Sequence, residues 1–172
     1  MVIALPPPKS LTSYVGGFVG MSSGNTATTT IKDSDVGGYI ESRSNAGGLV
    51  GYLHGTNSIT NCSNSATIFG GFSSAGGLAG YASGTTVIMN SSNHGDVSNL
   101  NTGENIGYCA GLVARGETNF TLLQSYNEGT IGGPSSYVAD LIADVYGNSG
   151  DNVLIANNYN VGKVYSEREG KF

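Results

Sequence analysis

The chain has 172 residues and a formal net charge of −5; 11% of its residues are charged, 38% are hydrophobic and 28 are glycine. The acidic balance disfavours nucleic acid as a partner, because phosphate neutralisation needs a basic surface, and the hydrophobic fraction argues against a disordered chain. No apolar stretch approaches the roughly twenty residues of a membrane-spanning helix, so we expect no membrane insertion.

The chain begins with a short apolar and proline-rich stretch from Met1 to Pro8. It has no basic region, and its apolar run is too short for a secretion signal. Three consecutive prolines are typical of a stiff linker. We therefore interpret residues 1–13 as an N-terminal linker or cap. Of two alternatives, an intracellular protein and a segment of a longer polypeptide, we favour the segment.

One pattern of roughly thirty residues then occurs five times, near 14–44, 45–73, 74–105, 106–136 and 137–165, and a period of this size predicts a stacked architecture. Each copy opens with a five-residue box centred on Leu or Phe. The boxes are Gly-Gly-Phe-Val-Gly at 16–20, Gly-Gly-Leu-Val-Gly at 47–51, Gly-Gly-Leu-Ala-Gly at 76–80, Ala-Gly-Leu-Val-Ala at 110–114 and Ala-Asp-Leu-Ile-Ala at 139–143.

The second half of each copy is marked by an Asn, or by Asp35 in the first copy; the others are Asn64, Asn93, Asn127 and Asn160. An apolar residue precedes this position by five at Ile59, Ile88, Leu122 and Ile155, with Thr30 in the first copy. Two insertions, within 98–105 and 144–152, are rich in Asn, Gly and Ser and predict loops. Residues 166–172 form a charged C-terminal tail.

These landmarks predict an all-β fold, a parallel β-helix or β-solenoid of about five coils with three short strands per coil. The box is predicted to be a strand with its Leu facing inward. We expect Asn64, Asn93, Asn127 and Asn160 to form a structural column at a corner, where Asn tolerates left-handed backbone and stacked amides can hydrogen-bond along the axis. A parallel column is expected at Asn61, Asn90, Gln124 and Asn157, with Lys32 in the first copy.

The stretches Asn45-Ala-Gly-Gly-Leu-Val-Gly-Tyr and Ser74-Ala-Gly-Gly-Leu-Ala-Gly-Tyr, each followed by a Thr-rich segment and an Asn-x-Gly/Ala turn, resemble GLUG-motif repeats. Such repeats occur in secreted and surface proteins of bacteria, including some immunoglobulin A peptidases and adhesins. The resemblance implies a parallel β-helical stalk or adhesion segment at the cell surface, and it supplies no catalytic residues.

The residues that could carry catalysis are few. His54 and His94 occupy different repeat positions and lack metal-ligand spacing, so we interpret them as surface residues without a role. Cys62 and Cys109 also differ in position, which predicts two small, semi-buried thiols and no disulfide. No Ser stands in a Gly-x-Ser-x-Gly elbow. We therefore predict that the chain is not an enzyme.

The strongest enzymatic alternative is a carbohydrate-active β-helix module with a carboxylate site near Arg115, Asp140 and Asp144. Arg115 and Asp144 share a repeat position three residues after the box Leu, so adjacent coils would bring them together as a salt bridge or as part of such a site. A hydrolytic pair would need a second acid within about 5–9.5 Å, which Asp140 meets only marginally.

The same repeat position carries Tyr52 and Tyr81, which together with Arg115 form the candidate binding surface for a sugar or a protein. No cofactor is expected, apart from calcium as an alternative to a plain solvated loop. The candidate calcium ligands are Asp144 and Asp151, together with Asn148 and Asn152.

The sequence thus predicts a non-enzymatic structural or adhesive segment of a larger bacterial extracellular protein, with host glycan or extracellular protein as its candidate partners. We expect a monomer or weak end-to-end association, because the ends of a solenoid expose unpaired strand edges.

Overall fold

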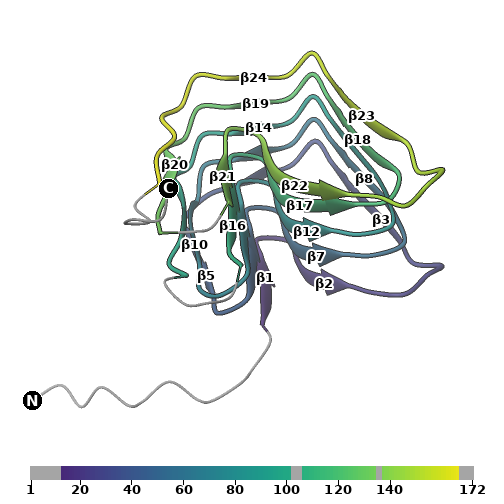
Figure 1. The fold of residues 1–172 in the computed structure, drawn as a ribbon, viewed down its shortest axis with the longest axis horizontal. Coiled ribbons are helices and arrows are strands. Elements are labelled where there is room, and N and C mark those ends of the chain that lie inside the picture. The colour runs from purple at the N-terminus through teal and green to yellow at the C-terminus, as the bar shows by residue number, and fades with distance from the viewer. Residues whose placement is uncertain (1–12, 102–105, 135–136, 167–172) are drawn as a thin grey trace, which may run out of the picture.

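The computed structural model describes residues 13–101, 106–134 and 137–166, and these residues form 24 β-strands and no helix. The predicted linker or cap at 1–13 and the tail at 166–172 lie almost wholly outside the described residues. The strands wind into about five stacked coils, so the predicted β-solenoid is confirmed (Figure 1). None of the described segments is a helix long and apolar enough to cross a membrane.

Each coil is built from consecutive short strands. The first coil contains β1 (Tyr14–Gly16), β2 (Val19–Ser22), β3 (Thr28–Lys32), β4 (Asp35–Val36) and β5 (Tyr39–Ser42). The second contains β6 (Asn45–Gly47), β7 (Val50–Leu53), β8 (Thr56–Thr60), β9 (Ser63–Asn64) and β10 (Thr67–Gly70). The third contains β11 (Ser74–Gly76), β12 (Ala79–Ala82), β13 (Thr85–Met89), β14 (Ser92–Asn93) and β15 (Val97–Asn99).

The fourth coil contains β16 (Tyr108–Ala110), β17 (Val113–Glu117), β18 (Phe120–Leu123), β19 (Tyr126–Asn127) and β20 (Ile131–Gly132). The fifth contains β21 (Tyr137–Ala139), β22 (Ile142–Tyr146), β23 (Val153–Ala156) and β24 (Tyr159–Asn160), and it ends with a single parallel bridge from Val164 to Ile131. The predicted loops fall between β15 and β16 and between β22 and β23.

Strands at equivalent positions pair in parallel and form five narrow sheets along the axis. Sheet A is β1-β6-β11-β16-β21, sheet B is β2-β7-β12-β17-β22, sheet C is β3-β8-β13-β18-β23, sheet D is β4-β9-β14-β19-β24, and sheet E is β5-β10-β15-β20. The prediction of three strands per coil is therefore corrected to five. The extra strands arise because each coil bends sharply at two corners that the sequence analysis placed inside continuous strands.

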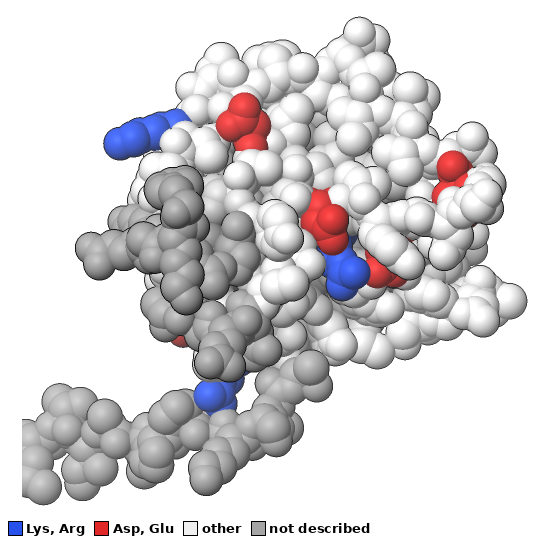
Figure 2. Space-filling model, viewed as in Figure 1, with Lys and Arg blue, Asp and Glu red and all other residues white. Residues whose placement is uncertain are grey.

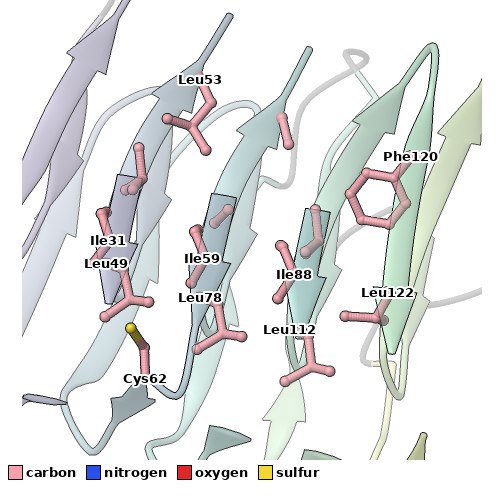
Figure 3. Packing of buried hydrophobic residues seen from close by; sticks show 14 residues of the cluster. Ile31, Leu49, Leu53, Ile59, Cys62, Leu78, Ile88, Leu112, Phe120 and Leu122 are labelled. Atoms are coloured by element: carbon pink, nitrogen blue, oxygen red, sulfur yellow. The ribbon is translucent and has the colours of Figure 1, made fainter. Parts of the chain in front are cut away.

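The core is a column of aliphatic side chains inside the coils (Figure 3). Leu49, Leu78 and Leu112 stack directly above one another and are fully buried. Burying one such side chain stabilises the fold by about 1.5–3 kcal/mol. The side chains at the two ends of the column are more exposed to solvent, since Leu141 is only partly buried and Phe18 is 49% exposed. A residue in an end coil has a neighbour on one side only.

The Gly-Leu box is a corner between sheets A and B, and not the single strand that was predicted. In the second coil β6 ends at Gly47, Gly48 and Leu49 form the bend, and β7 begins at Val50. A bend breaks the period of two, so Leu49 and Val50 are both buried. A Cβ on Gly47 would lie 2.0 Å from the Val50 carbonyl oxygen, so the close approach of the two strands requires glycine there.

The first copy was aligned one residue out of register. Ile31 pairs with Ile59, and Val36 with Asn64, whereas the sequence analysis assigned Thr30 and Asp35 to these positions. The reason is that two connections differ in length from those of the second coil, and the shorter one shifts the register by one residue. The first coil has a longer loop between β2 and β3 and a shorter corner between β5 and β6 than the second coil.

Left-handed backbone occurs in the second of the two expected columns and not in the first. Positive φ angles occur at the corner between sheets C and D, at Asp33, Asn61, Asn90, Gln124 and Asn157. Asp33 therefore takes the place that was assigned to Lys32. The column at Asn64, Asn93, Asn127 and Asn160 lies in the extended strands of sheet D. Its asparagines are selected for their side chains and not for a backbone conformation.

Candidate functional site

Sheets A and B meet at a sharp angle (Figure 1), and we call the group of outward-facing residues along this angle the tyrosine notch. It is defined by Tyr14 and Tyr108 from sheet A and by Tyr52, Tyr81, Arg115, Glu117 and Asp144 from sheet B. Side chains of the two sheets contact each other: the Tyr14 and Tyr52 ring centroids are 5.2 Å apart. This contact fits the angle between β16 and β17 in Figure 1, at which the chain turns from sheet A into sheet B.

The rings of the notch form a ladder parallel to the solenoid axis. Tyr52 and Tyr81 pack edge to face with centroids 5.1 Å apart. The Arg115 guanidinium continues the ladder, since it lies 5.0 Å from the Tyr81 centroid and 5.6 Å from that of Tyr108. Cation–π contacts of this kind hold a guanidinium flat against the rings.

Two carboxylates flank the same guanidinium. Arg115 Nε donates to Asp144 Oδ2 at 3.2 Å, and Arg115 Nη2 lies 3.2 Å from Glu117 Oε1. All three side chains are roughly two-thirds or more buried. Figure 2 shows that charged groups are sparse on this face and that blue and red atoms meet near its centre. The notch therefore combines aromatic faces with one cation and two anions in a partly desolvated place.

The tyrosine hydroxyls are held in their neutral form. Burial raises the pKa of Tyr81, and its hydrogen bond with Glu117 raises that pKa further. Burial also raises the pKa of Tyr52 and of Tyr108. A neutral phenol can donate one hydrogen bond and accept others. The notch thus combines hydroxyl, carboxylate and guanidinium groups with aromatic faces.

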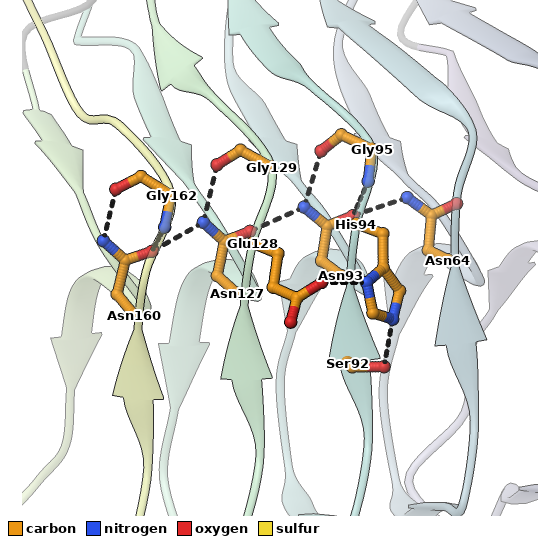
Figure 4. A network of polar contacts seen from close by, with 10 residues as sticks. All are labelled: Asn64, Ser92, Asn93, His94, Gly95, Asn127, Glu128, Gly129, Asn160 and Gly162. Atoms are coloured by element: carbon orange, nitrogen blue, oxygen red, sulfur yellow. Dashed lines mark hydrogen bonds and ion pairs between the residues drawn. The ribbon is translucent and has the colours of Figure 1, made fainter.

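The four asparagines of sheet D form a continuous ladder through the interior (Figure 4). Each Nδ2 donates to the Oδ1 of the next coil: Asn64 to Asn93 at 2.7 Å, Asn93 to Asn127 at 2.7 Å and Asn127 to Asn160 at 2.8 Å. Each Nδ2 also donates to the carbonyl two residues ahead in its own coil, as Asn93 does to Gly95.

The amide ladder explains the second glycine of the box. A Cβ on Gly48 would lie 2.4 Å from Asn64 Cγ, and one on Gly77 would lie 2.4 Å from Asn93 Cγ. The bend at the box thus packs its backbone directly against the amide in the middle of the coil. In the first coil this contact is apolar, since Gly17 faces the Val36 side chain.

One contact on sheet D resembles the hydrogen-bond pattern of a nucleophilic triad. His94 Nε2 lies 3.0 Å from Ser92 Oγ, and His94 Nδ1 lies 2.7 Å from Glu128 Oε2 (Figure 4). The sequence analysis did not anticipate these two contacts of His94. The repeat carried the missing signal, because Glu128 follows Asn127 as His94 follows Asn93.

A hydrolytic site would also need free N–H donors to stabilise an oxyanion, and the backbone N–H groups of these three residues do not supply them. The backbone N–H groups of Ser92, His94 and Glu128 donate to the carbonyls of Cys62, Asn64 and Asn93 respectively, so none of the three is free to stabilise an oxyanion. We interpret the contact as a cross-strand His–Glu pair with a neighbouring hydroxyl.

The other predicted site residues are divided among separate places. Asp140 lies at the box corner of the fifth coil, where it lines a hollow at the end of the solenoid, whereas Asp144 contacts Arg115 in the notch. The Asp151 carboxylate accepts a hydrogen bond from the Asn148 N–H at 2.7 Å. Within the described residues, no three His, Cys, Asp or Glu side chains are grouped so that they could hold a metal ion. The calcium assignment stays a prediction.

Both cysteines are free and buried. Cys109 pairs with Ala75 and Val138 in sheet A. Burial raises the pKa of the Cys109 thiol to about 12 and also raises that of Cys62, so neither thiol is a ready nucleophile.

Some residues of the notch were missed in the sequence. Tyr14 and Tyr108 lie two positions before the first residue of their boxes, and Glu117 lies two after Arg115. The repeat aligns these positions, but only knowledge that the box is a sharp corner would place sheets A and B face to face.

Comparison with known families agrees with this architecture. The model of the GLUG motif matches residues 42–68 and 73–98, which extend from the end of β5 into β10 and from the corner before β11 into β15. No curated protein and no solved structure matches the chain. The chain therefore contains two GLUG motifs, and they form the second and third coils of its β-solenoid.

Proposed function

We propose that this chain is a non-enzymatic segment of a larger bacterial extracellular protein, in which the solenoid is a rigid spacer and the tyrosine notch binds glycan. The fold is a structural repeat type and not a known enzyme class. The observation that carries the binding role is the ladder of Tyr52, Tyr81 and Arg115, flanked by Asp144 and Glu117.

A glycan suits this surface better than a protein does. Aromatic faces stack on the apolar faces of sugar rings, and carboxylates and guanidinium groups hydrogen-bond to their hydroxyls. Rings of adjacent coils lie about 5 Å apart between centroids, so an extended polysaccharide could contact more than one ring along the notch.

Catalysis is not favoured by the charges of the notch. Glycoside hydrolysis needs one carboxylic acid as a proton donor and a second carboxylate as nucleophile or base. Here both carboxylates accept contacts from one guanidinium, and Asp140, the third acid of the enzymatic alternative, lines a different surface.

The test uses the full chain on a glycan array, followed by calorimetric titration of the oligosaccharides that bind. Tyr81→Ala and Arg115→Ala are expected to weaken binding at least tenfold, which is about 1.4 kcal/mol. The matched control is Tyr126→Ala, because Tyr126 also stacks on the outer surface, 4.9 Å from Tyr159 and outside the notch.

Equal losses in Tyr81→Ala and Tyr126→Ala would contradict the proposal, as would binding to no glycan. Binding of host matrix proteins through the notch would replace glycan as the ligand. Degradation of a polysaccharide that Asp144→Ala abolishes would establish the enzymatic alternative.

The extracellular location is proposed from the family resemblance and from a surface in which Gly, Ser, Thr and Asn replace most charged residues. Fractionation of the cells that produce the full-length protein tests it. Surface exposure, shown by protease sensitivity of intact cells, is expected. Recovery of the protein only from the cytoplasm would contradict the proposal.

A further inference from the structure

The C-terminal face of the fifth coil exposes the side chains that earlier coils bury. Val153 and Ile155 pair with Phe120 and Leu122, which are fully buried, yet Val153 and Ile155 are each 46% exposed. A hollow of 480 Å³ opens beside them and is lined largely by apolar side chains, among them Leu141 and Ile142. This face is a cross-section of the core that lacks a covering layer among the described residues.

The strands at this face are paired on one side only. The four strands of the fifth coil, β21, β22, β23 and β24, are the last members of sheets A to D. Such edges present unpaired N–H and C=O groups to which another strand can add. Since every pairing below them is parallel and in register, the geometry favours a parallel strand.

The amide ladder specifies which strand would fit. Its donors all point toward the C-terminal end, so Asn160 Nδ2 donates to Gly162 O at 2.8 Å and has no amide oxygen above it among the described residues. Asn160 Oδ1 already accepts from Asn127 Nδ2 and from the Gly162 N–H, which uses both of its lone pairs. The open end of the ladder therefore offers a donor and needs an acceptor.

The opposite end of the ladder differs. Asn64 is the first amide, and the residue below it in the column is Val36. A second copy of this chain that stacked head to tail would place Val36 over Asn160 and leave the donor unpaired. Two copies that met by their C-terminal faces would each present an oxygen that is already occupied.

We propose that the C-terminal face of the fifth coil is an interaction surface for one further parallel coil of the GLUG type that carries Asn in the ladder column. Such a coil would cover Leu141, Ile142 and Ile155, pair with the edges of sheets A to D, and accept the Asn160 N–H on its own amide oxygen. The inference concerns assembly and does not depend on the glycan-binding role.

The test replaces residues 170–172 with a copy of the third coil that begins at Ser74, so that the copied Ser74 follows Asn160 at the spacing that separates Ser74 from Asn64. In the matched control the copied Asn93 is replaced by Val, the residue that the first coil itself carries in this column. Amide hydrogen exchange of Leu154, Ile155 and Ala156 and the thermal midpoint are measured for the unextended chain and for both extensions.

The Asn-bearing extension is expected to slow exchange in β23 at least tenfold and to raise the midpoint by several degrees, and the Val control to achieve clearly less. Unchanged exchange with the first five coils folded would overturn the docking proposal. Equal protection by both extensions would overturn the requirement for an amide acceptor. Concentration-dependent dimerisation of the unextended chain, abolished by Ile155→Lys, would assign the face to a second copy and overturn the proposed occupant.

Discussion

The asparagine ladder predicts that one residue type should have very different importance at different coils. Asn93 is fully buried and takes part in four hydrogen bonds, two as donor to Gly95 O and Asn127 Oδ1 and two as acceptor from Asn64 Nδ2 and the Gly95 N–H. At about 1 kcal/mol net for each bond, Asn93→Ala should lower the free energy of unfolding by about 4 kcal/mol. The buried groups left without partners add to this loss.

Asn160 is the matched comparison, because it occupies the same column at the end of the ladder. It takes part in three hydrogen bonds, and it is only partly buried, so water can replace the partners that are lost. Asn160→Ala should therefore cost about 1–2 kcal/mol.

Urea unfolding followed by circular dichroism measures both losses, with the dependence on urea concentration expected to be the same in the two variants. A stability of 5–15 kcal/mol is usual for a domain, so both variants should be measurable. Losses that agree within about 0.5 kcal/mol would refute the idea that the ladder is cooperative and strongest in its interior.

Three further predictions test other features. Gly77→Ala should lower the free energy of unfolding in urea by about 3 kcal/mol, because the added Cβ would lie 2.0 Å from Gly111 O. Gly37→Ala is the control, since its nearest contact is a hydroxyl at 3.1 Å, and it should change stability by less than about 0.5 kcal/mol. Similar losses in the two variants would contradict the corner packing. Thr118→Gly should raise the free energy of unfolding by about 1 kcal/mol, because the β-branched Thr118 has a φ of 62°. The second and third coils have Gly55 and Gly84 at this position. A lower melting temperature of the variant would contradict this prediction. The free energy of unfolding should fall between pH 9 and pH 12, because the pKa of the Cys109 thiol is about 12 in the folded chain and 9.0 ordinarily, so the thiol of the unfolded chain is deprotonated first. Unfolding titrations should show a smaller fall in Cys109→Ala. An unchanged fall would contradict the assignment.

The repeat made the architecture predictable. Five recurrences of a Leu between glycines, with an Asn at a fixed distance, indicate stacked coils and the buried column of Leu49, Leu78 and Leu112. The number of strands per coil could not be read in the same way. A corner at Gly48 and a strand through Gly48 give the same pattern of small and apolar residues, and only tertiary packing against Asn64 separates them.

The first coil shows a second limit of the sequence. The corner at 43–44 is one residue shorter than its counterpart at 71–73, so an alignment that holds this spacing constant is shifted by one residue. The substitution of Val36 for the ladder Asn hid the true register, because Asp35 is the nearest residue that resembles Asn.

The candidate site was predictable only along one sheet. Tyr52, Tyr81, Arg115 and Asp144 share a repeat position, and the parallel register places them in one column. Tyr108 and Glu117 join them through the angle between sheets A and B and through side-chain direction, neither of which is encoded by spacing.

The most direct test of the stacked solenoid is one distance in solution. Lys32 and Ala156 occupy the same outward column of sheet C in the first and fifth coils. Four strand spacings of about 4.8 Å place their backbones roughly 19 Å apart. Spin labels at Lys32→Cys and Ala156→Cys, with both native cysteines replaced by Ala, should give a narrow distribution near this value by double electron–electron resonance. A broad distribution, or one centred beyond roughly 30 Å, which exceeds any reach of four stacked strands, would contradict the fold.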